Sequence, residues 1–340
     1  GLGGDDRLYG GDDFDLLRGG TGNDSLYSGV GTGHGAEMQG GAGDDIYYVN
    51  ASDSTITETV GNGTDTVRAS VSIQLDAEDD IEVMRVHDQT TSDAIDLGGS
   101  DIGNQMRGNE GANVFRGGAG NDTMYGYGGD DTYQIDQTVD VVSESAGNGH
   151  DTILTSIDLQ LGSTQDIEVL RALDESSSTG MRLIGNNLDN EIFGTDGADS
   201  LIGNGGNDRL HAHDGDDTVR GGTGVDEVVL DLASTVASGT LQSTGLLLQT
   251  QTGSKLIGSD VERLVFTDRT LSYAEAAELV STVAIAGDLT GDNDLTGTTG
   301  DDNINGGRGS DTLRGLAGND LLYGDAGTDT LLGGEGADTL

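Results

Sequence analysis

The fold class that the sequence predicts is all-β, a right-handed parallel β-roll or β-helix solenoid in which short strands stack as successive turns of a coil. Three observations lead to this prediction. A nine-residue pattern recurs in 20 units, a period of 86 residues repeats part of the chain, and Gly supplies 60 of 340 residues while Pro and Cys are absent. Such short units cannot bury their apolar residues alone, so they must stack on their neighbours.

The nine-residue pattern is clear in "GGTGNDSLY" at 19–27. Across the 20 units the eighth position is always apolar, and the sixth is Asp in 15 units, Asn in four and Ala36 in one. Glycines at positions one, two and four permit positive φ, and the three residues after the turn place one side chain inward and two outward. We therefore expect each unit to be a turn plus a minimal strand, and two units to complete one turn of the coil.

The two periods divide the chain into seven predicted segments. Nonapeptide blocks span 1–48, 99–134, 185–229 and 288–340, and β inserts span 49–98, 135–184 and 230–287. The first two inserts are copies, because residues 40–125 align without a gap on 126–211, and "DIEVMR" at 80–85 returns as "DIEVLR" at 166–171. The alternation in "TVRASVSIQL" at 66–75 predicts strands with one buried face.

The third insert differs because it contains a helix candidate near 273–284. Ser272 and Glu275 have the spacing of a capping box, and residues that favour helices follow them. We expect one short lateral helix here.

The charge of the chain restricts its partners. With 61 acidic and 15 basic residues the net charge is −46, which disfavours nucleic acid and anionic membrane surfaces. No apolar stretch is long enough to predict a transmembrane segment. High charge with low hydrophobicity alone would fit a disordered chain, but the strict columns of the repeat argue against disorder as the final state.

The sixth-position carboxylates predict a cation. Stacking would place them roughly 4.8 Å apart along one edge, which is unfavourable unless a cation lies between them. Carboxylates and backbone carbonyls are hard oxygen ligands that favour Ca²⁺, whereas Mg²⁺ requires a tighter octahedral geometry. The sequence therefore predicts several Ca²⁺ ions as cofactors, with each repeat supplying half of a site.

The same residues carry a family resemblance. "GGTGNDSLY" resembles the RTX, or haemolysin-type, calcium-binding nonapeptide, and the resemblance extends over all 20 units. It implies a parallel β-roll in which Ca²⁺ lies between turns two units apart, held by position-six side chains and carbonyls of the glycine-rich turns. Carried onto this chain, the metal ligands would be Asp6, Asp15, Asp24, Asp45, Asp122, Asp131, Asp199, Asp208, Asp217, Asp226, Asp302, Asp311, Asp320, Asp329 and Asp338, together with Asn104, Asn113 and Asn190.

Some of these positions depart from the pattern. The three Asn residues would supply a neutral oxygen and bind more weakly. Ala36, which would lie opposite Asp15, leaves that site without its second carboxylate. In the inserts, the recurring acids are further candidates: Glu58, Asp65, Glu144 and Asp151.

Other chemistry is not indicated. The sequence has no G-x-S-x-G, no H-E-x-x-H and no Cys nucleophile, so we predict no catalytic residues and no enzyme. His211 and His213 form an H-x-H pair, which we interpret as part of a solvated rim rather than a zinc site.

Two functional classes fit these features. The first is an extracellular Ca²⁺-binding structural or interaction protein, such as a surface stalk, surface-layer component or adhesin-like segment, that folds on Ca²⁺ binding after secretion. The alternative is the Ca²⁺-dependent folding and secretion module of a secreted enzyme or toxin whose active domain lies outside this chain. The resemblance implies type I secretion from a Gram-negative bacterium, with a secretion signal beyond Leu340. The expected location is extracellular, including the bacterial cell surface, and the expected partners are calcium ions, with self-association and cell-surface partners left open.

Overall fold

The computed structural model describes residues 1, 3–31, 33–59, 63–144, 147–231, 238–242, 244–250, 252–281, 284–286, 291–298 and 300–340. The chain forms two compact units. Unit 1 comprises 1–175 and 181–193, and unit 2 comprises 176–180 and 194–340. The bounds of the seven predicted segments remain predictions.

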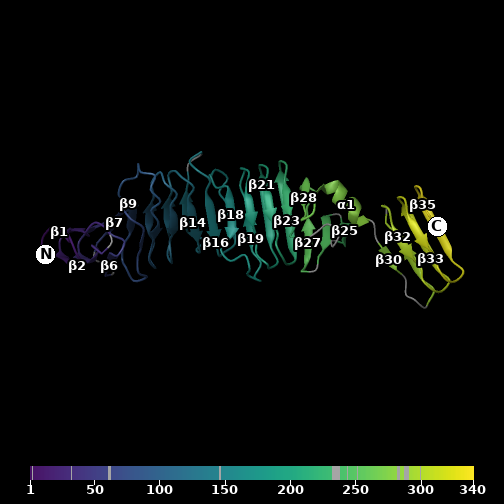
Figure 1. Ribbon diagram of the computed structural model, residues 1–340, viewed down its shortest axis with the longest axis horizontal. Coiled ribbons are helices and arrows are strands. Elements are labelled where there is room, and N and C mark those ends of the chain that lie inside the picture. The colour runs from purple at the N-terminus through teal and green to yellow at the C-terminus, as the bar shows by residue number, and fades with distance from the viewer. Residues whose placement is uncertain are drawn as a thin grey trace. The chain divides into compact units, whose positions relative to one another are not determined.

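Unit 1 contains a parallel sheet of eight strands in the order β1-β3-β5-β7-β9-β11-β13-β15. Figure 1 shows strands of this unit following one another as rungs. The strands are β1 (Arg7–Tyr9), β3 (Ser25–Tyr27), β5 (Ile46–Val49), β7 (Thr66–Ala69), β9 (Val83–Val86), β11 (Gln105–Arg107), β13 (Thr123–Tyr125) and β15 (Val141–Ser143).

The remaining strands of unit 1 also pair in parallel. One series is β8 (Ile73–Gln74), β10 (Leu97–Gly98), β12 (Val114–Arg116), β14 (Thr132–Ile135), β16 (Thr152–Thr155), β18 (Val169–Ala172) and β20 (Glu191–Phe193). The others are β2 (Asp15–Thr21) with β4 (Ala36–Ala42) and β6 (Thr55–Ile56), and β17 (Leu159–Gln160) with β19 (Arg182–Ile184).

The core follows from the register of these strands. Leu8 pairs with Leu26, 18 residues on, and Leu26 pairs with Tyr47, so position-eight side chains stack in one column. Leu26 and Tyr47 are fully buried. The predicted parallel pairing of units two apart is therefore confirmed.

Unit 2 contains parallel strands of the repeat and antiparallel strands of the third insert. In parallel pairing are β21 (Ser200–Gly205), β23 (Asp217–Thr223) and β27 (Ser254–Ile257), then β22 (Arg209–His211), β24 (Glu227–Val229) and β28 (Arg263–Val265). Antiparallel pairing joins β25 (Ser238–Gln242), β26 (Gly245–Gln249) and β27, and also joins β28 to β29 (Thr270–Ser272). The third insert therefore interrupts the parallel series.

The last block of unit 2 returns to parallel pairing. Its first sheet is β30 (Ala284–Ala286), β32 (Asn303–Asn305) and β34 (Leu321–Tyr323), and its second is β31 (Asp294–Thr296), β33 (Thr312–Ala317) and β35 (Thr330–Glu335). Ile304, Leu313 and Leu322 form the buried cluster of this block.

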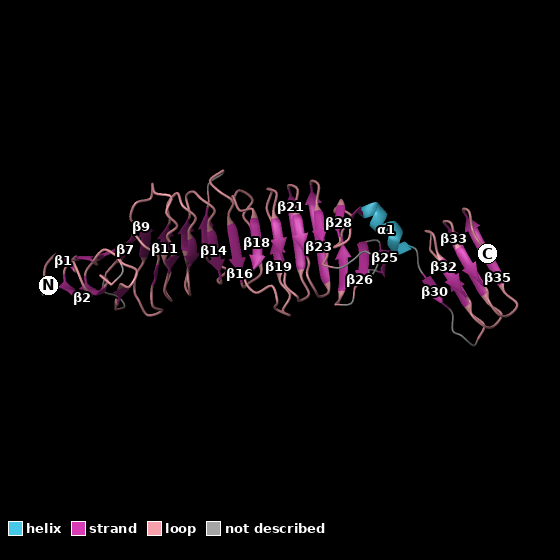
Figure 2. Ribbon diagram, in the orientation of Figure 1, coloured by secondary structure: helices cyan, strands magenta, loops and turns pink. Residues whose placement is uncertain are grey.

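The predicted helix is present as α1 (Tyr273–Ser281), which Figure 2 shows in cyan. The capping box is formed, because the Ser272 hydroxyl donates to Glu275 over 2.7 Å and the Glu275 amide donates back to the Ser272 hydroxyl over 3.2 Å. The predicted end at 284 is wrong, since Ala284 begins β30. No helix among the described residues is long and apolar enough to cross a lipid bilayer.

Candidate calcium sites

In most units the sixth residue lies just before or at the start of the short strand. In ten of them one carboxylate oxygen links two neighbouring turns of the coil, which we call tiers. Asp24 Oδ1 accepts the backbone N–H of Asp6 over 2.7 Å, and Asp45 Oδ1 accepts that of Asp24 over 2.6 Å. The same bond recurs along the chain at Asp122, Asp131, Asp217, Asp226, Asp311, Asp320, Asp329 and Asp338. The amide-to-carboxylate ladder thus fixes the spacing of the turns.

Most of the predicted ligands are buried. Fully buried are Asp24, Asp45, Asp122, Asp131, Asp199, Asp208, Asp217, Asp226, Asp302, Asp311, Asp320, Asn104, Asn113 and Asn190. Asp6, Asp15, Asp329 and Asp338, in the first and last blocks, are half-buried. Burial withdraws the carboxylates from water, and a charged group without water needs a compensating charge.

The second carboxylate oxygen has no such compensation in many tiers. Among the described residues, no hydrogen-bond donor reaches the buried Oδ2 of Asp15, Asp24, Asp45, Asp122, Asp131, Asp311 or Asp320. Burial raises the pKa of Asp45 to about 6 and that of Asp131 to about 8, because loss of hydration disfavours the charged form. A bound cation would reverse this effect.

The glycine at position one keeps open the space that these oxygens face. A Cβ placed on Gly19 would lie 2.1 Å from Asp24 Oδ2 and 2.6 Å from the carbonyl oxygen of Gly40 in the next tier. A Cβ on Gly315 would lie 2.0 Å from Asp320 Oδ2 and 2.5 Å from the next tier's carbonyl oxygen. A carboxylate and a carbonyl oxygen thus converge where only Gly fits. Hard oxygen donors in a flexible turn suit Ca²⁺.

The tier of Asp217 supplies a cation of its own to the second carboxylate oxygen. Lys255, the only lysine in the sequence, is 1% exposed. Its Nζ lies 2.5 Å from Asp217 Oδ2 and 2.8 Å from the turn carbonyl of Gly215. Position one of this unit is Ala212 instead of Gly, so a methyl group narrows the turn. Asp217, a predicted calcium ligand, therefore already has a positive charge on its second oxygen.

The Asn tiers satisfy themselves by hydrogen bonds. Asn113 Oδ1 accepts the N–H of Asn109 over 3.0 Å, while Asn113 Nδ2 donates to the carbonyl of Ile95 over 2.9 Å. Asn104 and Asn190 make corresponding contacts. An amide supplies both a donor and an acceptor, so these turns close without an added charge.

Two further kinds of turn depart from the simple pattern. Asp199 Oδ2 accepts the N–H of Thr195 over 2.6 Å, and Asp302 makes the same contact with the residue four positions before it. Asp15 pairs in register with Ala36, and its amide donates to the carbonyl of Gly35 instead of to a carboxylate. The gap that the sequence predicts opposite Asp15 is therefore present.

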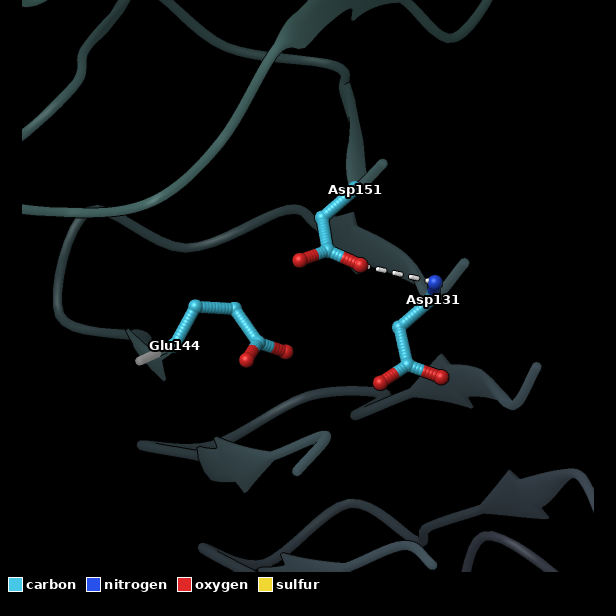
Figure 3. Close-up of side chains that lie close together, drawn as sticks. All are labelled: Asp131, Glu144 and Asp151. Atoms are coloured by element: carbon cyan, nitrogen blue, oxygen red, sulfur yellow. Dashed lines mark hydrogen bonds between the residues drawn. The ribbon is translucent and has the colours of Figure 1, made fainter. Parts of the chain in front are cut away.

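The insert carboxylates join the ladder. Asp131, Glu144 and Asp151 place one oxygen each within 4.8 Å of one another, and Figure 3 shows the three side chains converging. Asp151 Oδ1 accepts the N–H of Asp131 over 2.8 Å, and the hydroxyl of Tyr133 donates to Glu144. A Cβ on Gly126 would lie 2.0 to 2.1 Å from oxygens of Asp131, Glu144 and Tyr133, so three oxygens meet at one point.

The first insert repeats this arrangement at the 86-residue offset. Asp65 Oδ1 accepts the N–H of Asp45 over 2.7 Å, and the hydroxyl of Tyr47 donates to Glu58. Burial raises the pKa of Asp65 to about 7 and that of its counterpart Asp151 to about 6. The inserts therefore continue the carboxylate edge rather than interrupt it.

Three glutamates outside the nonapeptide pattern also continue the amide-to-carboxylate ladder. Glu82, Glu168 and Glu262 each accept, over 2.7 Å, the amide of an aspartate one tier earlier. All three lie in a D-I/V-E stretch, at 80–82, 166–168 and 260–262. That recurrence was the available signal for them. For Lys255, the signal was a single lysine within an acidic chain.

The H-x-H pair does not belong to a close group of three metal-ligating side chains among the described residues. The ring centroids of His211 and His213 are 6.3 Å apart, and His213 Nδ1 lies 3.2 Å from Asp231 Oδ2. Within the described part of the chain, the one group of three close metal-ligating side chains is Asp131, Glu144 and Asp151.

A comparison with known families agrees with this geometry. The model of the RTX calcium-binding nonapeptide repeat (4 copies) matches residues 1–33, 38–56, 98–133, 184–228, 289–320 and 305–340, which together are more than half of the chain. A search of curated proteins finds no match.

Proposed function

Because the chain belongs to the RTX calcium-binding nonapeptide repeat family, we propose that it is an extracellular structural or interaction protein whose tiers fold and lock when Ca²⁺ binds. The observation that carries this proposal is the set of buried Oδ2 atoms without a donor, which includes those of Asp24, Asp45 and Asp320. The ions would bind there, each between a position-six carboxylate and turn carbonyls. The predicted position-six residues are the proposed ligands, with Asp217 already compensated by Lys255.

The free energies favour a switch rather than a permanently folded chain. An uncompensated buried carboxylate costs several kcal/mol even after relaxation, and the net charge of −46 adds repulsion between tiers. Extracellular calcium sites have Kd values of roughly 10⁻⁴ to 10⁻³ M. Free Ca²⁺ about tenfold above Kd would stabilise the fold by about 1.4 kcal/mol per site. Summed over many tiers, this stabilisation by Ca²⁺ would keep the chain folded outside the cell, whereas the chain would be unfolded in a calcium-poor cytosol.

A structural or binding role, not a catalytic one, is part of the proposal. The carboxylates that come close together are held by backbone amides of the preceding tier, as at Asp131 and Asp151. The 86-residue copies extend the same edge and so lengthen the solenoid in modular steps. These features support a stalk or surface segment.

The test is a Ca²⁺ titration of the full chain at low ionic strength, followed by far-ultraviolet circular dichroism. We expect β signal to appear with Ca²⁺, to be much weaker with equal Mg²⁺, and to vanish in excess chelator. Asp24→Ala should raise the Ca²⁺ concentration needed for folding, whereas Asp12→Ala, at an exposed site, should not. A β spectrum that is unchanged in excess chelator would sink the proposal.

A further inference from the structure

The outer face of the eight-stranded sheet of unit 1 is rich in Arg and Tyr. The outward residues are the first and third of each strand. From β1 to β15 these positions contain four Arg, four Tyr and no Asp or Glu. Outward positions of other strands, such as β12, β14, β16 and β18, also contain few acids, so the distinguishing feature of this face is its concentration of Arg and Tyr.

The third residues form one continuous row, which we call the arginine–tyrosine ladder. The strand register aligns them in the order Tyr9, Tyr27, Tyr48, Arg68, Arg85, Arg107 and Tyr125. Figure 2 labels β1, β7, β9 and β11 of this sheet. Neighbouring members are separated by one strand spacing, roughly 4.8 Å.

The tyrosine rings of the ladder cover one another. Tyr9 and Tyr27 stack with centroids 4.6 Å apart, and Tyr27 and Tyr48 stack at 4.1 Å with nearly parallel planes. The guanidinium of Arg68 lies over the Tyr48 ring at 5.4 Å, and that of Arg107 lies over the Tyr125 ring at 5.5 Å. Because the ring faces are used in this way, the ladder offers hydroxyls and guanidinium N–H groups at its outer edge.

The ladder arginines have no internal anion. None of the ion pairs found between described residues includes Arg68, Arg85 or Arg107. The buried Nε atoms of Arg68 and Arg107 have no hydrogen-bond partner there either. Burial and the two neighbouring guanidiniums lower the pKa of Arg85, which shows that the three charges crowd one another.

Some arginines elsewhere in the chain pair with acids, although others, such as Arg116 and Arg220, make no ion pair among the described residues either. Arg209 and Arg263, in unit 2, both pair with Glu227, and Arg314 pairs with Asp294. An acidic chain thus neutralises these guanidiniums with its own carboxylates. The ladder differs in that three arginines without an ion pair lie side by side in register, an arrangement that an external anion could bridge.

We propose that the arginine–tyrosine ladder binds a linear acidic polysaccharide that carries one carboxylate on each of several successive sugars. Guanidinium edges at Arg68, Arg85 and Arg107 would take the carboxylates in bidentate contacts. The neighbouring outward residue Thr66 would hydrogen-bond a sugar hydroxyl, and so would the Nε2 group of Gln105, whose Oε1 accepts from Arg107 Nη2 over 3.1 Å. The spacing of one strand per contact is comparable to the length of one sugar in an extended chain.

Charge favours a polyuronate over a nucleic acid as the occupant. The ladder is a short cationic strip on a chain of net charge −46, so a densely charged polyphosphate would be repelled by the surrounding acids. A polyuronate carries fewer charges for its length and many hydroxyls, which the polar residues of the face can bind. The proposal requires a folded sheet and does not depend on which calcium sites are filled.

The experiment is calorimetric titration of the full, Ca²⁺-saturated chain with an oligogalacturonate too short to gel with calcium. The test variant is Arg68→Gln/Arg85→Gln/Arg107→Gln. The matched control, Arg209→Gln/Arg263→Gln/Arg314→Gln, loses the same charge from paired arginines. We expect the ladder variant to bind about tenfold more weakly or worse, since charge-assisted contacts are lost, and the control to bind like the parent chain.

Circular dichroism with Ca²⁺ checks that each variant folds. Should the triple ladder variant not fold, Arg85→Gln and Arg85→Lys replace it, and the lysine variant should also lose affinity because it cannot make the bidentate contact. Three results would overturn the proposal: no tighter binding than to a neutral maltooligosaccharide, equal weakening in both triple variants, or tighter binding of a single-stranded oligonucleotide through the same arginines.

Discussion

The tiers of Asp24 and Asp217 meet the same electrostatic demand in different ways. In both, Oδ1 accepts an amide from the preceding tier, over 2.7 Å at Asp24 and 2.8 Å at Asp217. At Asp24 the second oxygen is buried without a donor, and at Asp217 it holds the ammonium of Lys255. The tethered lysine supplies a positive charge at Asp217, and we propose that a metal ion supplies it at Asp24.

The Asn tiers add a third solution, in which no charge is needed. Asn113 replaces the carboxylate by an amide that is both donor and acceptor. The demand for calcium is therefore uneven along the chain. It should be greatest where Oδ2 has no donor, as at Asp24 and Asp45, and least where Lys or Asn closes the turn.

The largest expected effect is that of calcium removal, and it should differ between tiers. In excess chelator, we expect amide hydrogens of β3 and β5 to exchange rapidly, because their turns bury uncompensated carboxylates. Amides of β23 and β27, beside the Lys255–Asp217 pair, should stay protected for longer. Hydrogen exchange followed by mass spectrometry measures both regions in one sample. Equal exchange in the two regions would show that the lysine does not replace an ion.

Acidification should partly substitute for calcium. The folded-state pKa values of Asp45, Asp65 and Asp131, about 6, 7 and 8, all exceed the ordinary value of 3.8. Between these limits the folded chain binds protons that the unfolded chain releases, so the free energy of unfolding falls as pH rises. We expect the calcium-free chain to gain β signal as the pH is lowered from about 8 to about 4.

In the presence of Ca²⁺ the effect of acid on folding has the opposite sign, which provides the control. Carboxylate ligands must be deprotonated, so acid competes with the ion and should raise the Ca²⁺ concentration needed for folding. Circular dichroism against pH, with and without Ca²⁺, separates the two cases. A calcium-free chain that loses β signal on acidification would contradict the burial argument.

How much of the fold and of the candidate sites could be predicted from the sequence depends on how far apart in the chain the interacting residues lie. The fixed columns at positions six and eight predicted the strands, the parallel pairing and the buried apolar column, since those features repeat locally. The ion pair between Lys255 and Asp217 could not be predicted, because the two residues are 38 apart in the sequence and an antiparallel excursion lies between them. The end of α1 was also misjudged, because strand pairing by Ala284 outweighs local helix preference.

The candidate ligands illustrate the same limit. The position-six aspartates were found because the nonapeptide repeats them at fixed spacing. Glu82 and Glu168 continue the ladder from a different spacing, so their role becomes visible only when the strands are stacked. The internal bonds of Asn104 and Asn113 are likewise a property of the folded turn.

Replacing Lys255 should be the most damaging single substitution at a tier. Lys255→Met removes the charge and leaves Asp217 buried alone, which we expect to destabilise the Ca²⁺-loaded chain by about 3–5 kcal/mol. Urea unfolding measures this difference. Lys255→Asp places a carboxylate opposite Asp217 in register. We expect the stability of this variant to depend on additional Ca²⁺. A methionine variant as stable as the parent would mean that the pair is dispensable.

The smallest effect is expected from exchanging a carboxylate for an amide, or an amide for a carboxylate, at position six of a single tier. Asp24→Asn should bind less calcium, yet it should be more stable than the parent in chelator by about 1–3 kcal/mol, the cost of one unsatisfied buried group. Its Oδ1 can keep the bond from the Asp6 amide, while its amide group faces the Gly40 carbonyl. The reverse substitution, Asn113→Asp, should make that tier dependent on calcium, because a carboxylate cannot donate to the carbonyl of Ile95. Unfolding in chelator and calorimetric ion counts on both variants decide the matter. The two substitutions must act in opposite directions, since one removes an uncompensated charge and the other creates it.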